Sequence, residues 1–315
     1  MSRLSQYQNT LLRTLRFDGV GVHSGKRVSM TLSPADANTG VVFSRTDLEG
    51  SPDIRGTVDA VSATALCTVL GDMAGAHVVT IEHLMAALRA MEVDNVLVEL
   101  DAAEVPVLDG SSAVFVEAIA ESGLRRQASL RNYIRILKPV RVEHGASWGV
   151  FTPHDRTRFE VEIDFAQDVI GRQIFAADLT PETFRTELSR ARTFGFMADV
   201  ERLWAAGFAL GSSLENSVVI GDDERIINPE GLRYVDEFVR HKTLDAVGDL
   251  ALAGAPILGT FRSYRGGHAL NAMMLQALFA DPTAWEWTVD ARPAARAANV
   301  GMLAAAGAAY EASKS

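Results

Sequence analysis

Residues 236–249, DEFVRHKTLDAVGD, predict one amphipathic helix whose two sides differ in chemistry. At ~100° per residue, His241, Asp245 and Asp249 fall within a sector of roughly 80°. The remaining side carries apolar residues that can pack against a core: Val239, Leu244, Val247 and Leu250. The helix is therefore expected to present an imidazole and two carboxylates in one column while its other side is buried.

His241 and Asp245 have a spacing that suits a metal site. Residues four apart lie above one another on a helix, so both side chains can reach one ion. A solvated polar face with a local hydrogen bond between the two side chains explains the same spacing. A metal site also needs a further ligand from elsewhere in the chain.

Residues 78–88, VVTIEHLMAAL, supply the best candidate for that ligand. Thr80 is expected to cap the N-terminus of a helix over residues 80–91. The apolar stripe of this helix consists of Ile81, Leu84, Met85 and Leu88. His83 points away from the stripe and Glu82 lies at its margin, so His83 is either an ordinary exposed histidine or a ligand.

The adjacent Glu82 and His83 suit a hydrolytic metal site, in which the histidine binds the ion and the carboxylate acts as general base on the attacking water. Two histidines, one aspartate and an open fourth position describe a catalytic zinc site. Structural zinc sites usually close with cysteine ligands, and this chain has a single cysteine.

Residues 264–271, YRGGHALN, place His268 directly after two glycines, which let backbone and substrate approach closely. His268 can then protonate a leaving group or stabilise an oxyanion. The alternative is an incidental loop histidine, which is the commoner meaning of this pattern on its own.

Together these motifs resemble one family, the zinc-dependent UDP-3-O-acyl-N-acetylglucosamine deacetylases of lipid A biosynthesis. The resemblance covers nearly the whole chain, in order and in spacing. The segments that carry it are residues 19–26 (GVGVHSGK), 34–40 (PADANTG), 80–84 (TIEHL), 105–111 (VPVLDGS), 192–195 (RTFG), 211–216 (GSSLEN), 241–245 (HKTLD) and 266–268 (GGH).

The resemblance implies a role for each matching residue. It implies zinc ligands at His83, His241 and Asp245, with Glu82 as general base. It further implies a set of residues that line or support the reaction centre: Thr193, Lys242, Asp249 and His268. Phe194 is expected to contact the substrate, and Asp164 with Phe165 resembles a pair that contacts the nucleotide.

An apolar segment over residues 193–210 has Met197, Val200, Leu203, Trp204 and Gly207 at helical spacing. Such a stripe usually packs in a core. The resemblance instead implies an insert, near residues 193–220, that forms a passage for the acyl chain of the substrate, with Leu203 and Phe208 in contact with it. Each methylene buried there would contribute roughly 0.8 kcal/mol.

Composition limits the class of protein. The 315 residues suffice for two domains, and no apolar run is long enough to span a bilayer. A single cysteine and the absence of an N-terminal apolar segment lead us to expect a cytoplasmic protein without disulfides. The net charge of −10 argues against a nucleic-acid partner. An anionic nucleotide sugar would need a local cation in such an acidic protein, and Lys242 is expected to supply it. The alternative is that Lys242 is an ordinary surface lysine. We expect a monomer.

The order of expected elements predicts an α+β fold with two similar domains. Strands precede helices in each half, and a polar basic stretch at 122–129 separates the halves. We expect domains over residues 1–127 and 128–290, each a sheet with packed helices, and an Ala-rich tail over 291–315. Helices sandwiched between the two sheets would bring His83 and His241 to one metal at the domain interface. Cys67 is expected to be a half-buried strand residue.

The expected reaction is zinc-dependent removal of acetate from the 2-acetamido group of UDP-3-O-acyl-N-acetylglucosamine, the committed step of lipid A biosynthesis. Glu82 takes the proton of the water, zinc and Thr193 hold the oxyanion, and Glu82 or His268 protonates the amine while Asp249 orients His268. Two alternatives stay open. One is a zinc hydrolase of another N-acyl substrate, and the other is a non-catalytic protein that binds lipid or nucleotide sugar.

Overall fold

The helix predicted over residues 236–249 is present as α5 (Glu237–Ala251), and the upstream helix is α1 (Glu82–Ala90). Both belong to a computed structural model that describes residues 5–289. The other helices are α2 (Ala113–Ser122), α3 (Pro181–Thr183), α4 (Met197–Ala205) and α6 (His268–Ala280). Strands and helices follow one another in the predicted order, so the mixed α+β class is confirmed.

Two larger sheets organise the chain. The first has the strand order β2-β3-β9-β4-β5, and β9 is parallel to β4 but antiparallel to β3. Its strands are β2 (Leu15–Val20), β3 (Arg27–Pro34), β9 (Val96–Leu100), β4 (Val41–Arg45) and β5 (Ile54–Arg55). Alternate residues of β3 and β9 are buried, as expected for a sheet with one face against a core.

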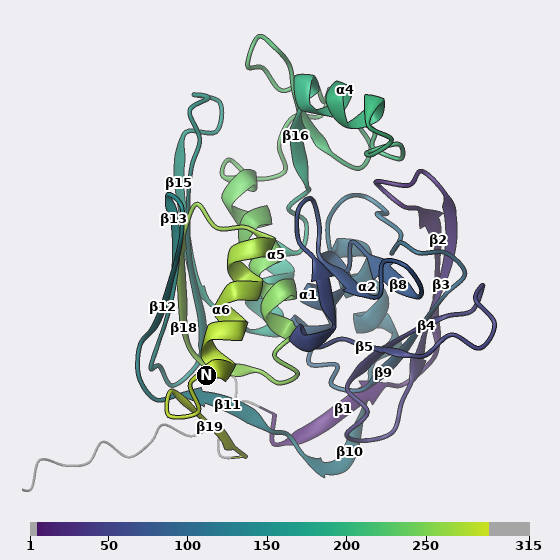
Figure 1. Ribbon diagram of the computed structural model, residues 1–315, viewed down its shortest axis with the longest axis vertical. Helices are drawn as coiled ribbons and strands as arrows, with labels where there is room; N and C mark the ends of the chain where they lie inside the picture. The colour runs from purple at the N-terminus through teal and green to yellow at the C-terminus, as the bar shows by residue number, and fades with distance from the viewer. Residues whose placement is uncertain (1–4, 290–315) are drawn as a thin grey trace, which may run out of the picture.

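The second sheet has the order β12-β13-β18-β11-β19, with β14 beside β18 and β15 beside β14. Its strands are β12 (Val140–His144), β13 (Ser147–Thr152), β18 (Ile257–Tyr264), β11 (Tyr133–Ile136), β19 (Trp285–Thr288), β14 (Thr157–Asp164) and β15 (Arg172–Asp178). In Figure 1, α1, α5 and α6 lie between this sheet and the first one.

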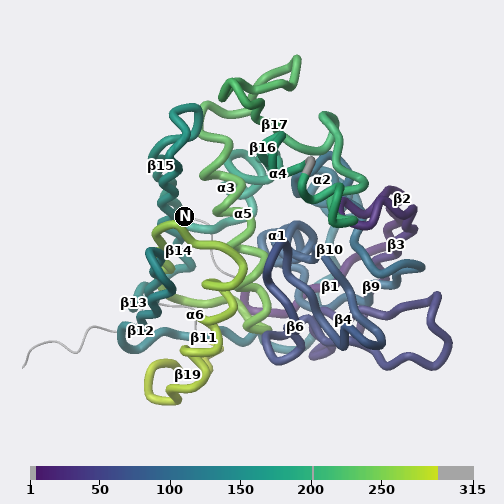
Figure 2. The backbone as a smooth tube through the Cα atoms, turned by 45° about the horizontal axis from the view of Figure 1, so that its top comes forward, coloured from purple at the N-terminus to yellow at the C-terminus, as the bar shows by residue number. Residues whose placement is uncertain are grey.

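Three small sheets complete the described chain. They pair β1 (Tyr7–Leu11) with β10 (Leu124–Leu130), β16 (Phe194–Phe196) with β17 (Val218–Ile220), and β6 (Val61–Ala63) with β7 (Val69–Gly71) and β8 (His77–Val79). Figure 2 shows β16, β17 and α4 gathered beyond one end of α5. Short one-turn elements lie at Val58–Ala60 and Phe184–Leu188.

Two local predictions were wrong. Thr80 does not cap α1, because its hydroxyl donates to the Glu104 carboxylate at 3.0 Å and Ile81 occupies the cap position. Cys67 is buried in a bend and not in a strand. The polar stretch at 122–129, which the sequence offers as a boundary between two halves, lies mostly in strand β10, and β10 pairs with β1. The predicted tail over 291–315 lies outside the described residues.

Helices α1 and α5 meet at a glycine. A Cβ atom added at Gly248 would lie 2.0 Å from the backbone oxygen of Glu82 and 2.7 Å from its carbonyl carbon. Since backbone cannot give way as a side chain can, only glycine allows this approach. The contact brings the first turn of α1, with Glu82 and His83, beside the C-terminal half of α5.

Gly248→Ala should therefore destabilise the protein. The added methyl group forces the two helices apart, and overpacking of this kind costs about 1–3 kcal/mol in the free energy of unfolding. Urea denaturation followed by circular dichroism measures the loss. Gly75→Ala is the control, because the nearest atom to its added Cβ is 3.4 Å away in an exposed turn. Equal stability of the two variants would contradict the proposed close contact.

Candidate metal centre

His83, His241 and Asp245 form a buried cluster whose candidate ligand atoms all lie within 4.8 Å of one another. Asp245 Oδ1 is 3.3 Å from His241 Nε2 and 3.6 Å from His83 Nε2. His83 comes from α1, and the other two residues are one turn apart on α5. The structure thus brings together the three residues that the two sequence motifs singled out.

The contact of His241 Nδ1 with a backbone oxygen determines the tautomer of the ring. Nδ1 lies 3.0 Å from the backbone oxygen of Ala191, which can only accept, so Nδ1 carries the proton and Nε2 is left as an acceptor. Burial lowers the pKa of His241 to about 3, although the carboxylate of Asp245 opposes the shift. The ring is therefore neutral at physiological pH and can donate a lone pair.

Asp245 provides the test of whether the cluster suits a cation. Its Oδ1 is buried and has no hydrogen-bond partner among the described residues, while Oδ2 accepts from Lys242 Nζ at 3.0 Å. Burial alone would raise the pKa of Asp245, but His241 and Lys242 hold it well below the usual range. A carboxylate oxygen thus faces the acceptor nitrogen of His241, an arrangement that a cation stabilises and that fits the donor set of a metal site.

Glu82 lies next to the cluster and is almost fully buried. Its Oε2 accepts from the backbone N–H of Thr68 at 3.1 Å, and its Oε1 lies 3.8 Å from His268 Nε2. Burial raises the pKa of Glu82, against the opposing influence of His268 and His83. A carboxylate with a raised pKa beside a cavity is suited to proton transfer near neutral pH.

His268 begins α6 and is held by Asp249. Its Nδ1 lies 2.9 Å from Asp249 Oδ2, and Asp249 also accepts from Thr68 Oγ1 at 2.6 Å and from Asn271 Nδ2 at 2.8 Å. Burial alone would lower the pKa of His268, but the carboxylates of Asp249 and Glu82 outweigh it and raise the pKa to about 10. His268 is therefore a cation at neutral pH, in contrast to the neutral His241.

A cavity of about 210 Å³ opens over the cluster. Among the predicted substrate residues, Thr193, Phe194, Leu203 and Lys242 line it. Phe208, Asp164 and Phe165 are outside this lining. The Phe208 ring contacts His23, the Phe165 ring contacts Phe194, and Asp164 accepts from Tyr264 at 2.6 Å.

The apolar insert has both exposed and buried side chains. Trp204 and Phe208 are 47% and 46% exposed, whereas Val200, Leu203 and Ala209 line the cavity above the cluster. The insert therefore adds an apolar wall to a cavity whose remaining lining mixes polar and apolar residues.

Sequence reasoning assigned no role to two further residues here. His23, in the 19–26 motif, lines the cavity and keeps a buried Nδ1 without a hydrogen-bond partner among the described residues. Glu104 is buried and accepts from the backbone N–H groups of His23 and Ser24, both at 2.9 Å. Glu104 stands outside every motif, so only the fold reveals that it holds the His23 turn.

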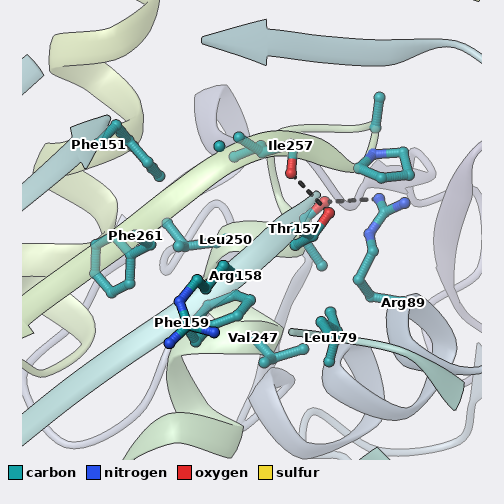
Figure 3. Close-up of a pocket in the computed structure, with 14 residues that line it drawn as sticks. Arg89, Phe151, Thr157, Arg158, Phe159, Leu179, Val247, Leu250, Ile257 and Phe261 are labelled. Carbon is teal, nitrogen blue, oxygen red and sulfur yellow. Dashed lines mark hydrogen bonds between the residues drawn. The ribbon is translucent and has the colours of Figure 1, made fainter. Parts of the chain in front are cut away.

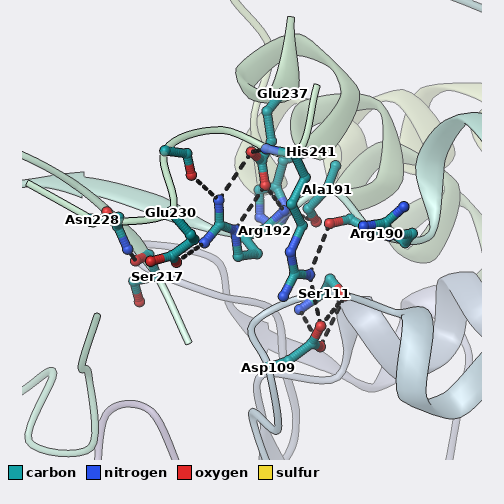
Figure 4. A network of polar contacts seen from close by, with 12 residues as sticks. Asp109, Ser111, Arg190, Ala191, Arg192, Ser217, Asn228, Glu230, Glu237 and His241 are labelled. Carbon is teal, nitrogen blue, oxygen red and sulfur yellow. Dashed lines mark hydrogen bonds and ion pairs between the residues drawn. The ribbon is translucent and has the colours of Figure 1, made fainter. Parts of the chain in front are cut away.

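A buried ion pair fixes the segment that orients His241 (Figure 4). Arg192 donates to Glu237 from its backbone N–H at 3.0 Å and from Nε at 2.9 Å, and both side chains are essentially inaccessible. Arg192 follows Ala191, the acceptor for His241, and precedes Thr193. We interpret Arg192 and Glu237 as positioning residues that fix this segment against the start of α5.

Arg192→Met should cost about 3–5 kcal/mol of unfolding free energy, because it leaves the Glu237 carboxylate buried without its cation. Replacing both partners, as in Arg192→Met with Glu237→Met, should recover most of the loss. Arg225→Met is the matched control, since Arg225 is exposed and 3.7 Å from Asp223, and it should change little. Chemical denaturation measures all three, and an unchanged Arg192→Met variant would contradict the assignment.

Comparison with known proteins identifies the family. Residues 8–280 match the family model "LpxC: UDP-3-O-acyl N-acetylglycosamine deacetylase". Proteins of Brucella ovis and Brucella canis, both named UDP-3-O-acyl-N-acetylglucosamine deacetylase, are 58% identical to the chain over 283 residues. The alignments cover 90% of this chain and 99% of each relative. The resemblance stated from the motifs is confirmed.

Proposed function

The chain belongs to the LpxC family of UDP-3-O-acyl-N-acetylglycosamine deacetylases, and from this premise we propose that His83, His241 and Asp245 hold its zinc ion. The enzyme deacetylates UDP-3-O-acyl-N-acetylglucosamine in lipid A biosynthesis. The observation that carries the zinc proposal is the buried Asp245 Oδ1, which has no hydrogen-bond partner among residues 5–289 and faces two imidazole nitrogens. Zinc in this position supplies Lewis-acid chemistry, polarising the amide carbonyl and making water more acidic.

Glu82 is proposed as the general base. Its carboxylate sits beside the cluster, and its raised pKa matches the task of taking a proton from the attacking water. His268, kept cationic by Asp249, lies 3.8 Å from Glu82 in the same cavity lining and offers positive charge to the oxyanion. The leaving amine then receives its proton from Glu82 or from His268.

Thr193 and Lys242 are proposed to complete the reaction centre. Thr193 is fixed by backbone hydrogen bonds to Gly110 and Val218, both at 2.8 Å, and lines the cavity, where its hydroxyl can contact the oxyanion. The Lys242 ammonium lies 3.0 Å from Asp245 and over the ring of Phe194. It supplies the local cation that an anionic nucleotide sugar needs in an acidic protein. Asp164 and Phe165 remain our proposal for the nucleotide contacts.

We also propose two α+β domains, over residues 1–127 and 128–290, with helices between their sheets and the cavity at the junction. The proposal is supported by the composition of the sheets: the five-stranded sheet uses strands before residue 101, and the seven-stranded sheet uses strands after residue 132. Among residues 5–289, no helix has both the length and the apolar character needed to cross a bilayer. A cytoplasmic location and a monomeric state stay expectations.

The metal assignment predicts that two kinds of variant differ in zinc content although both lose activity. His83→Ala, His241→Ala and Asp245→Ala should each lose zinc and activity together, because each removes one of three ligands. Glu82→Gln is nearly isosteric and should keep zinc, yet lose about 10²–10⁴-fold in kcat, the usual contribution of a positioned acid–base group. Elemental analysis and a deacetylation assay give the two readouts. Full zinc content in the three ligand variants, or normal turnover by Glu82→Gln, would refute the respective role.

The apolar wall predicts dependence on acyl-chain length. Leu203→Gln places a polar group against the chain and should lower kcat/KM about tenfold for a long-chain substrate, equivalent to roughly two unburied methylenes. A short-chain analogue should be little affected. Ala205→Gln, an exposed change on the same helix, is the control. Equal losses for both chain lengths would show that Leu203 only stabilises the insert.

A further inference from the structure

Thr68 is a buried threonine that contacts two carboxylates of the candidate active site. Its exposed fraction is 1%, and it lies directly before β7. The backbone N–H donates to Glu82 Oε2 at 3.1 Å, and the hydroxyl donates to Asp249 Oδ1 at 2.6 Å. Thr68 therefore bonds to the proposed general base and also to the aspartate that holds His268.

The N–H group of Thr68 fixes the orientation of the Glu82 carboxylate. Among residues 5–289, this N–H is the only hydrogen-bond donor to the Glu82 side chain. Because Oε2 is held by that bond, Oε1 is directed elsewhere and lies 3.8 Å from His268 Nε2. The carboxylate thus keeps one oxygen available to take a proton from water.

The hydroxyl of Thr68 completes the hydrogen bonding of Asp249. Oδ2 lies 2.9 Å from His268 Nδ1 and accepts from Asn271 Nδ2 at 2.8 Å, whereas Oδ1 accepts from Thr68. An ionised carboxylate can only accept, so the hydroxyl is the donor. Rotation of the carboxylate would break bonds at both oxygens. The Thr68 hydroxyl therefore fixes the plane of the group that holds the His268 ring.

Packing elsewhere on α5 fixes the backbone of Asp249. Figure 3 shows Val247 and Leu250 near the rings of Phe159 and Phe261, around a mainly apolar pocket of only about 20 Å³. On the side of α1, the glycine contact with that helix leaves equally little space. Because α5 is held on both sides, the rotation of its Asp249 side chain is the freedom that the Thr68 hydroxyl restricts.

The position of Thr68 is set by the segment that leads into α1. Its backbone oxygen accepts from the N–H of Thr80 at 3.1 Å, two residues before Glu82. Strand β7 begins with the next residue, and it pairs with β8, which ends just before Thr80. One small sheet thus places Thr68 beside the start of α1, although Asp249 is 181 positions further along the chain.

We infer that Thr68 is a positioning residue for the deacetylation step. It holds Glu82 directly and His268 through Asp249, so the proposed base and the proposed oxyanion partner keep a fixed mutual arrangement. Thr68 is not among the described residues that line the cavity over this site, so it acts without touching the substrate. The inference rests on the proposed function, because the roles of Glu82 and His268 are themselves proposals. Displacement of such a group by about 1 Å costs on the order of 10²-fold in rate.

The test compares Thr68→Val with Thr68→Ser in the full-length zinc-loaded enzyme. Valine has nearly the same shape as threonine but no hydroxyl, and both variants keep the N–H that bonds to Glu82. Thr68→Val should lower kcat about 10–100-fold, the usual effect of removing an outer partner of an active-site group. Zinc content and KM should stay unchanged, since Thr68 forms no hydrogen bond with the proposed ligands in the described chain and does not line the cavity. Thr68→Ser keeps the hydroxyl and should restore most of the rate.

Thr10→Val is the matched control for structural effects. Thr10 is also buried, and its hydroxyl donates to the backbone oxygen of Asn95 at 2.6 Å, but Thr10 is not among the described residues that line the cavity. Both valine variants should unfold at a lower urea concentration, because each loses a buried hydrogen bond, whereas only Thr68→Val should lose kcat. Normal kcat in Thr68→Val, or an equal loss in Thr68→Ser, would overturn the inference. If Thr68→Val does not fold, Thr68→Ala also removes the hydroxyl without adding bulk and is judged by the same criteria.

A double-mutant cycle with Asp249→Ala tests whether the hydroxyl acts through Asp249. Adding Thr68→Val to Asp249→Ala should cost little further rate, because the acceptor of the hydroxyl is already absent. A full additional loss would contradict the inference. Glu82→Gln separates this outcome from a failure of the proposed function. Normal turnover by Glu82→Gln would remove the general base, whereas an impaired Glu82→Gln beside a fully active Thr68→Val would remove only the role of Thr68.

Discussion

The close approach of α1 and α5 at Gly248 is the constraint on which the rest of the site depends. With a glycine facing the carbonyl of Glu82, the two helices come near enough for His83 to reach Asp245, although 162 positions separate them. Neither helix carries a complete metal site. In the proposed site the first supplies a base and one ligand, the second supplies two ligands, and the hydrophobic burial that packs the helices keeps all of them out of water. The packing of α1 against α5 is therefore also the contact that brings the residues of the proposed metal site together.

The two buried histidines, His241 and His268, have pKa values shifted in opposite directions, because different groups surround them. His241 donates to a neutral carbonyl and shares Asp245 with Lys242, so burial dominates and the ring stays neutral. His268 faces Asp249 and Glu82, and their combined charge overcomes burial. A neutral imidazole can bind a metal ion, and an imidazolium can stabilise negative charge. One cavity thus contains both forms at the same pH without any difference in residue type.

Much of the candidate metal site could be predicted from the sequence, because helical periodicity determines which side chains share a face. His241 and Asp245 were predicted as a pair from spacing alone, and Glu82 with His83 from the stripe beside them. The failures came from long-range contacts. Thr80 has the residue type of a helix cap, but Glu104, which is 24 positions away, takes its hydroxyl. The partnership of Arg192 with Glu237 likewise depends on which distant segments meet. Local pattern carries no information on such pairings.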